Sequence, residues 1–229
     1  MTKNIVFTDV TGSSVALKPV PAASMIPDWY KKSESYPNEK KIPNGKGGSN
    51  ATIKRCMPVF DAITSGYLLL LPADVYVLEK DGQPFYQWVD FDLISFHPVE
   101  QAQLHPTNKQ VPYPKFINPW AIKTPPGYST LFTHPMHRDL PFTVLPGVVD
   151  TDKYTATVNI VFTLNDNKFE GLIPKGTPIA QVIPFKRENW KMELGKDKEV
   201  REHFQVSKML NTKFFDRYKS FFRTIKEYK

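Results

Sequence analysis

The chain has 229 residues, of which 41% are hydrophobic and 13% aromatic, and its formal net charge is +7. This length allows one large or two small domains, and this composition excludes wholesale disorder because it suffices for a substantial core. No run of 18 apolar residues occurs, and the first residues lack the zones of a signal peptide. A single cysteine, Cys56, leaves no internal disulfide, so we expect a reducing, cytoplasmic setting.

Charge and proline are distributed unevenly along the chain. Residues 186–229 contain 13 Lys/Arg and 7 Asp/Glu, a net of +6, and all 21 prolines precede residue 186. This change of composition predicts a nearly neutral body followed by a basic tail. We therefore divide the chain into an N-terminal extension with an exposed loop over 1–50, a β domain over 51–187 and a basic helical tail over 188–229.

The first half alternates short apolar segments with turn residues. Residues 36–51 combine Pro, Asn, Gly and Lys, which is typical of an exposed loop. A short helix is predicted over 57–66, since Pro58 suits a first helical turn and Gly66 suits an end. Further on, Asp-Gly at 81–82 indicates a tight hairpin turn. The pattern predicts strands over 68–71 and 75–78 and a returning strand over 87–94.

The second half predicts many short strands. Prolines recur every few residues from 97 to 126, which excludes long helices and favours short edge strands with turns. Alternating apolar residues then predict strands over 128–133, 141–145, 155–164, 169–173 and 178–185. This spacing indicates a mainly β protein with a small barrel or sandwich-like core.

The tail has a different periodicity. Residues 199–211 and 212–229 both fit helices, and in the second helix aromatic residues recur at spacings of three and four. We expect this helix to pack its aromatic face on the β-body or on a neighbouring subunit. A nucleic-acid-binding arm or a helix that lies on a membrane surface is the alternative, because the tail is basic. No membrane partner is expected.

Three segments, in this order, resemble motifs of the trimeric dUTPase and dCTP deaminase superfamily. They are Pro125-Pro-Gly-Tyr128, then Pro146-Gly-Val-Val-Asp-Thr-Asp152, then Lys175-Gly-Thr-Pro-Ile-Ala-Gln-Val-Ile183. The resemblance covers roughly residues 122–187 and implies a divergent β-clip fold, with a C-terminal helical tail added to it. It also implies a homo-oligomer, a trimer by analogy.

The resemblance implies a site as well, although several of its parts are missing. Asp150 matches the family's acid that orients the attacking water, and Gln181 matches a residue of the last motif. The family's aromatic residue falls at Lys153, or at Tyr154 if one residue is inserted. No Arg-Ser-Gly segment or glycine-rich C-terminal lid is present, so Lys153, Arg138 or His137 would be the replacement phosphate ligand if the chain is a nucleotide hydrolase. Tyr128 completes this ligand-binding set, and Mg²⁺ would be the cofactor only if the chain is a nucleotide hydrolase.

A second constellation suggests a metal site. His134, His137 and Asp139 are closely spaced, and His97 or His105 from the proline-rich stretch could add another ligand. Imidazole and carboxylate groups are ordinary ligands of transition metals. Surface or turn histidines are the alternative interpretation of the same residues.

The sequence also resembles uncharacterised phage and bacterial proteins that share three features, found here as Lys54-Arg-Cys56, Trp120-Ala-Ile-Lys-Thr-Pro-Pro-Gly-Tyr128 and Gly147-Val-Val-Asp-Thr-Asp152. Our leading hypothesis is a non-catalytic binding or assembly module on a dUTPase-like fold, associated with other virion subunits if the chain is phage-encoded. Its location would then be the host cytoplasm or the virion. The alternatives are a divergent nucleotide hydrolase that uses Asp150, and a nucleic-acid-binding protein that uses the tail.

Overall fold

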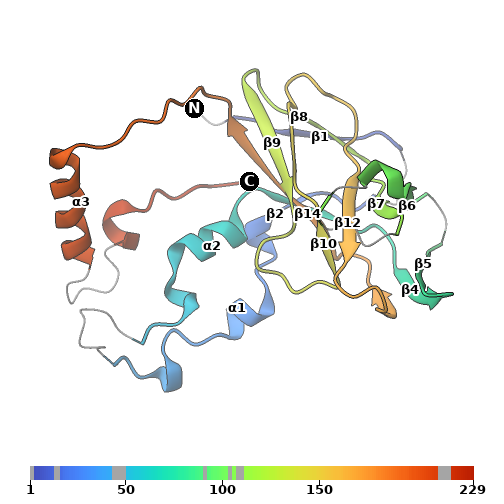
Figure 1. The fold of residues 1–229 in the computed structure, drawn as a ribbon, viewed down its shortest axis with the longest axis horizontal. Coiled ribbons are helices and arrows are strands. Elements are labelled where there is room, and N and C mark those ends of the chain that lie inside the picture. The colour runs from blue at the N-terminus through green and yellow to red at the C-terminus, as the bar shows by residue number, and fades with distance from the viewer. Residues whose placement is uncertain are drawn as a thin grey trace.

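The computed structural model describes residues 3–12, 16–42, 50–89, 92–102, 105–106, 111–210 and 218–229 (Figure 1). Fourteen strands dominate these residues: β1 Val6–Asp9, β2 Val20–Pro21, β3 Tyr67–Leu70, β4 Val75–Lys80, β5 Gln83–Gln87, β6 Ile94–His97, β7 Tyr113–Phe116, β8 Trp120–Lys123, β9 Tyr128–Thr133, β10 Phe142–Val144, β11 Gly147–Val149, β12 Ile160–Leu164, β13 Gly171–Ile173 and β14 Pro178–Lys186. Three α-helices accompany them: α1 Asp28–Lys32, α2 Met57–Thr64 and α3 Asp197–Leu210. The prediction of a mainly β protein with a C-terminal helix is confirmed.

The strands form four antiparallel sheets. Their orders are β11-β9-β14-β3-β2, β10-β12-β7-β6, β13-β4-β5 and β1-β8. The longest strand, β14, lies between β3 and β9, so it joins the two halves of the largest sheet. Strands β1 and β2 belong to the first 50 residues, and they pair with β8 and β3 respectively.

One hydrophobic core lies between the sheets. Strand β12 shows the expected alternation, since its even-numbered residues are buried and its odd-numbered residues are half-buried. Its Phe162 stacks on Phe116 of β7 with ring centroids 4.0 Å apart, and Phe142 of β10 lies 5.4 Å from Phe162. These three fully buried rings fix the β10-β12-β7 sheet against the rest of the core.

The hairpin from β4 to β5 differs from the prediction at its second strand. The turn residues Asp81 and Gly82 have φ angles of +53° and +77°, as a tight turn of this kind requires. Because the turn uses only two residues, the chain returns at once as β5, over Gln83–Gln87, and not over 87–94. The next strand, β6, begins at Ile94.

Helix α2 ends as predicted and passes the chain to β3 through Gly66. This glycine has a φ angle of +70°, and a Cβ atom placed on it would lie 2.1 Å from the carbonyl oxygen of Val182 in β14. Only glycine therefore allows α2 to end this close to the central sheet.

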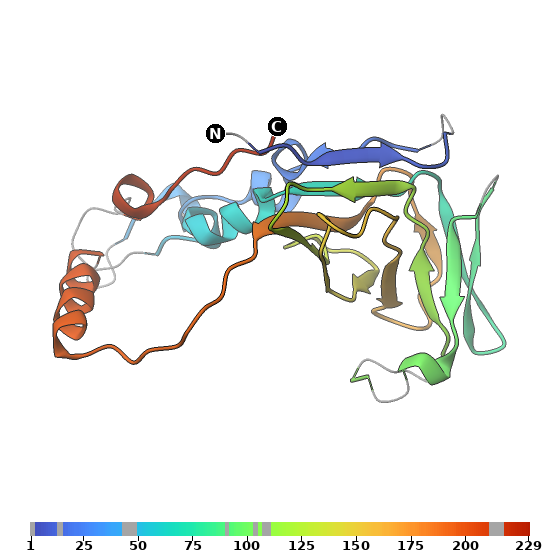
Figure 2. The ribbon, with the colours of Figure 1, turned by 90° about the horizontal axis from the view of Figure 1, so that it is seen from above.

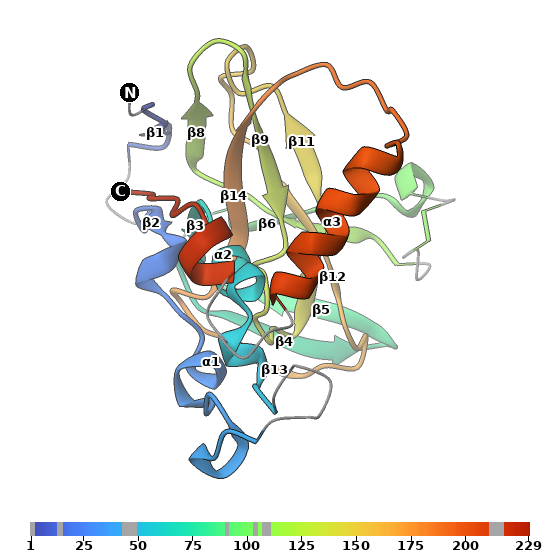
Figure 3. The same cartoon turned by 90° about the vertical axis from the view of Figure 1, so that its left-hand side faces the viewer.

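An arm leaves the body after β14. Residues 188–208, which we call the arm, are all exposed and include α3 up to its last turn. Figures 1 and 2 show the arm extending away from the sheets at one end of the molecule before the chain returns toward them. In Figure 3, which looks along that direction, α3 lies in front of the body.

The chain returns to the body in an irregular conformation. A helix was predicted over 212–229, but residues 211–217 lie outside the described residues and only Tyr218–Phe222 form a single π-helical turn beyond them. Arg223 then bonds to Asp61 of α2, with 2.6 Å from its Nη2 atom to Oδ1, and the ring of Tyr228 packs against Tyr67. These tertiary contacts hold the last residues in an irregular path and override the helical periodicity.

Among the described residues, no helix is both long enough and apolar enough to cross a bilayer.

The close approach at Gly66 gives a stability prediction. Gly66→Ala combines a positive φ angle, which costs a non-glycine residue about 1–2 kcal/mol, with the contact to the Val182 carbonyl oxygen. Gly82→Ala is the matched control, because Gly82 also has a positive φ angle but its Cβ atom would meet nothing within 4 Å. We expect Gly66→Ala to lower the urea midpoint clearly more than Gly82→Ala. Equal effects would contradict the close contact.

Candidate functional site

The motif around Asp150 lies where three strand ends meet. Strand β9 pairs with β11 on one side and with β14 on the other, so the residues that flank these strands come together. Asp150 and Asp152 follow β11, Ser129 lies near the start of β9, and Arg187 follows β14 directly. We call these four residues the Arg187 cluster.

Arg187 bonds to every other member of the cluster. Its Nη1 atom lies 2.8 Å from Oδ1 of Asp152, 3.1 Å from Oδ1 of Asp150 and 3.1 Å from Oγ of Ser129. Its Nη2 atom donates to the other carboxylate oxygen of Asp152, so this ion pair is bidentate. The backbone N–H of Arg187 also donates to the carbonyl oxygen of Gly127, at 2.8 Å, which fixes the start of the side chain.

The two acids differ in exposure but are both held ionised. The side chain of Asp152 is 7% exposed and that of Asp150 is 52% exposed. The guanidinium of Arg187 lowers the pKa of Asp152, helped by the Gly127 N–H. The hydroxyl of Ser129, which donates to Asp150 at 2.6 Å, is the main cause of the lowered pKa of Asp150, and Arg187 adds to it.

Buried threonines lie beneath the cluster. The Thr151 hydroxyl lies 2.8 Å from those of both Thr124 and Thr130, and all three residues are buried. The backbone N–H of Thr124 donates to the Thr151 carbonyl oxygen at 3.2 Å. This network fixes the backbone between the two acids. Neither Arg187 nor the threonines were predicted, because their partners are 21 to 35 residues distant in sequence.

Lys153 and Tyr154 lie beside Asp150 in sequence but are exposed. Their backbone N–H groups both donate to the Asp150 carbonyl oxygen, at 2.9 and 2.8 Å, which closes the turn after β11. The hydroxyl of Tyr154 lies 3.4 Å from the carbonyl oxygen of Thr157.

Gln181 is fully buried and satisfies three backbone groups. Its side-chain oxygen accepts from the N–H of Met136 at 2.9 Å, and its amide nitrogen donates to the carbonyl oxygens of Ala62 and Ser65 at 2.8 and 2.6 Å. Gln181 thus ties the end of α2 and the loop after β9 to β14. The prediction that Gln181 binds a ligand remains a prediction, and these contacts give the residue a structural role.

The predicted metal ligands lie on the loop after β9. His137 and Asp139 are exposed, whereas His134 is half-buried and burial lowers its pKa. The ring nitrogens of His134 lie 3.4 Å from the Val144 N–H and 3.4 Å from the Arg138 carbonyl oxygen. Within the described ranges, no three His, Cys, Asp or Glu side chains come close enough together to hold a metal ion.

Arg138 is bonded away from Asp150. Its Nη2 atom donates to the carbonyl oxygen of Met25 at 2.6 Å, and burial lowers its pKa. Its Nη1 atom is buried, and no described residue forms a hydrogen bond with it. His97 and His105 make contacts elsewhere, with Gln101 and with the ring of Tyr113 respectively.

Tyr128 lines a different cavity, of about 300 Å³, where the two ends of the chain meet. Tyr67 and Tyr228 line it as well, together with Lys3, whose ammonium lies 5.9 Å from the centroid of the Tyr128 ring, and Glu227. The predicted ligand-binding residues are therefore distributed over separate places, and Asp150 shares its immediate surroundings with Arg187 and Ser129.

The contacts of the Arg187 cluster show whether its carboxylates could bind a divalent cation. A magnesium ion needs carboxylate oxygens with free lone pairs and space for its waters. Here the bidentate Arg187 occupies both oxygens of Asp152, and Arg187 and Ser129 share Oδ1 of Asp150. The cluster does not fit a magnesium site, because Arg187 and Ser129 already occupy three of its four carboxylate oxygens.

This chain is similar to a phage dUTPase. The solved structure is that of a mutant dUTPase from phage phi11 of S. aureus, described for its coordination of a structural Mg(II) ion. The similarity covers 86% of this chain and 99% of that chain, with 12% identity and a TM-score of 0.36. No protein-family model and no curated protein matches the sequence. The structure comes from the family that the three sequence motifs resemble, and at this identity and TM-score nothing about substrate, metal or activity follows.

The lowered pKa values of the two acids predict a pH dependence. A carboxyl group whose folded pKa lies below its unfolded value of about 3.9 stabilises the fold above that value, and the contribution disappears as the pH falls through the folded pKa. Arg187→Gln should therefore lower the free energy of unfolding at pH 7. The difference from wild type should shrink as the pH falls from about 5 to about 2.

Urea unfolding at several pH values measures this difference. Lys186→Gln is the matched control, because Lys186 is the neighbouring cation but pairs only with the exposed Glu188. This control should change the unfolding free energy little at any pH. A difference for Arg187→Gln that stays constant from pH 7 to pH 2 would mean that Arg187 acts through packing and not through its charge.

Proposed function

We propose that the chain is a non-catalytic assembly subunit that associates with a second copy of itself through the arm. The observation that carries the proposal is the exposure of large apolar side chains along the arm. Trp190, Met192 and Leu194 are 87%, 87% and 86% exposed, and Phe204 of α3 is 71% exposed. Large apolar side chains that are exposed together in one segment suggest an interaction site.

The arm carries two patterns that favour protein association. In residues 190–194 apolar side chains alternate with Lys191 and Glu193, as in a strand with one covered face. In α3, Val200 and Phe204 are four residues apart and therefore lie on one face of the helix. Neither face is covered by the chain itself, since all described residues of the arm are exposed.

The Arg187 cluster supports the same proposal. A nucleotide hydrolase needs cations and N–H donors directed at the phosphates and an acid directed at the attacking water. Arg187 is instead neutralised by two carboxylates of its own chain, and Asp150 is bonded to Ser129 and Arg187. The bonds of the cluster thus run between its own members and to the backbone of Gly127 and Tyr128, and they link three strand ends.

The basic tail also contributes less free charge than its composition suggests. Arg223 and Lys226 both bond to Asp61 of α2, so they attach the tail to the body. This use of two cations favours assembly over the nucleic-acid alternative.

The first test concerns catalysis. We expect no pyrophosphate release from any deoxynucleoside triphosphate at high protein concentration with Mg²⁺, measured by a coupled phosphate assay. Asp150→Asn serves as the control for contamination. Turnover that Asp150→Asn abolishes while the circular dichroism spectrum stays unchanged would overturn the proposal and establish the hydrolase.

The second test concerns association. When a residue that anchors an interface is truncated to alanine, the binding free energy falls by about 2 kcal/mol or more. This corresponds to about a thirtyfold change in Kd. Combined substitution of Trp190, Met192 and Leu194 by Ala should therefore abolish self-association in sedimentation equilibrium. A Lys191→Ala/Glu193→Ala chain, changed at the alternate positions of the same segment, should associate as wild type does. A wild-type chain that stays monomeric at all concentrations would overturn the proposal.

A further inference from the structure

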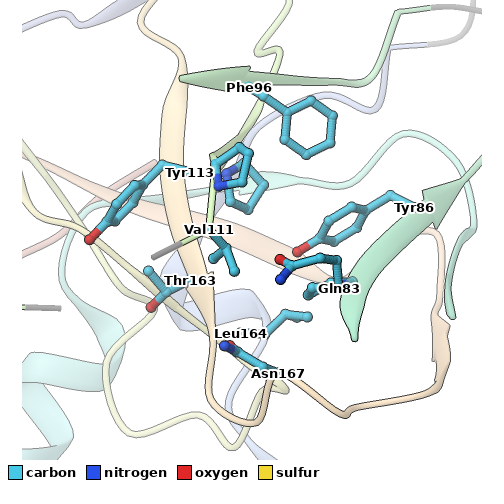
Figure 4. Close-up of a pocket in the computed structure, with 11 residues that line it drawn as sticks. Gln83, Tyr86, Phe96, Val111, Tyr113, Thr163, Leu164 and Asn167 are labelled. Atoms are coloured by element: carbon cyan, nitrogen blue, oxygen red, sulfur yellow. The ribbon is translucent and has the colours of Figure 1, made fainter. Parts of the chain in front are cut away.

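A cavity of about 270 Å³ opens at the end of the body that carries β5, β6 and β7. Its apolar walls include Tyr86, Phe96, Tyr113 and Val111, and the amide side chains of Gln83 and Asn167 also line it. Figure 4 shows Gln83, Tyr86 and Val111 directed into one space, with Asn167 at one side of it. We call this space the aromatic cavity.

The aromatic cavity suits one aromatic side chain. Pockets for small molecules usually measure about 300–1,000 Å³, so this cavity lies just below their range. Aromatic walls favour an aromatic occupant through edge-to-face and stacked contacts. Two amide side chains at the wall offer acceptors for a single N–H group, which an indole ring carries.

Trp190 is an aromatic side chain with an N–H group, as the aromatic cavity requires. It is the most exposed aromatic side chain of the described residues, at 87%, and it lies in the first part of the arm. The arm and the aromatic cavity lie at opposite ends of the longest axis of the molecule (Figures 1 and 2). Trp190 is three residues after the anchored Arg187, which limits the distance between their Cα atoms to about 11 Å. Because the cavity of its own chain lies at the opposite end of the molecule, a cavity that receives Trp190 would belong to another molecule.

We propose that Trp190 of one copy enters the aromatic cavity of a second copy. This inference rests on the proposed function and specifies the surface that receives the arm. Because donor and acceptor surfaces differ and lie at opposite ends, the contact is head-to-tail, and repeated contacts produce a ring or a filament.

The two aromatic side chains of the arm supply part of the apolar area that a specific interface needs. Trp190 and Phe204 alone would bury roughly 300–500 Å², since an aromatic side chain buries about 150–250 Å². Each partner of a standard interface contributes about 800 Å². Met192, Leu194 and Val200 supply further apolar surface on the arm, and Phe96, which is 48% exposed, supplies it at the rim of the cavity.

A head-to-tail contact can be tested by complementation between two variants. Trp190→Ala removes the donor and keeps the cavity, whereas Asn167→Arg places a long charged side chain in the cavity and keeps the donor. The matched controls are Lys191→Ala in the arm and Gln87→Arg on the exposed face of β5, which repeats the added charge outside the cavity. Sedimentation velocity gives the size distributions, and circular dichroism confirms that each chain is folded.

We expect each of the two variants to associate at least about tenfold more weakly than wild type, and the two controls to associate as wild type does. An equimolar mixture of Trp190→Ala and Asn167→Arg should form dimers of twice the chain mass and nothing larger, because each dimer retains one intact contact. If Asn167→Arg does not fold, Phe96→Ala replaces it, since that exposed ring forms part of the wall.

Two results would overturn the inference, and they differ in meaning. If Trp190→Ala prevents association but both cavity variants associate normally, the arm binds another surface, and the proposed assembly function survives. If wild type itself stays monomeric, the proposed function and the inference both fail, and the cavity is open to an aromatic group from a different protein.

Discussion

The bidentate ion pair between Arg187 and Asp152 fixes how the strand ends and the start of the arm are arranged in this protein. It joins the end of β14 to the turn after β11, and both strands pair with β9. Asp152 is almost buried, so its charge requires a partner, and Arg187 supplies one without leaving the sheet. Arg187 is therefore the last residue that the body holds before the arm, and the exposed arm begins directly after it.

The same interaction gives both acids of this motif a structural use. The fold uses both acids of the turn after β11, because Asp152 accepts from Arg187 and from the Gly127 N–H, and Asp150 contacts Arg187 and Ser129. A carboxylate that is needed to pair strand ends is subject to the same chemical requirement as a catalytic carboxylate, namely ionisation at neutral pH. The resemblance at Asp150 therefore indicates a carboxylate that is ionised at neutral pH, and does not by itself indicate catalysis.

The sequence predicts the turns, strands and helix ends that depend on residues close together in the chain. Asp81-Gly82 specifies its turn, the alternation in β12 specifies a strand with one buried face, and Pro58 and Gly66 mark the limits of α2. Contacts between distant residues leave no such local pattern. Arg187 could not be assigned to Asp152, 35 residues earlier, nor Gln181 to Ala62, because pairing depends on strand order. The last residues follow an irregular path for the same reason, since Asp61 and Tyr67 hold them.

Because Arg223 and Lys226 bond to Asp61, the folded molecule does not depend on an unbroken chain through the arm. They anchor the residues after the arm to α2, just as Arg187 anchors those before it, so the arm is a loop attached at both ends. A protease that cuts the exposed arm would therefore leave two fragments held together by the ion pairs and by the packing of Tyr228 on Tyr67. A nicked molecule would migrate as one particle in its native state and as two pieces only after denaturation. Cleavage would turn the arm from a loop into two free ends and would leave the fold of the body intact.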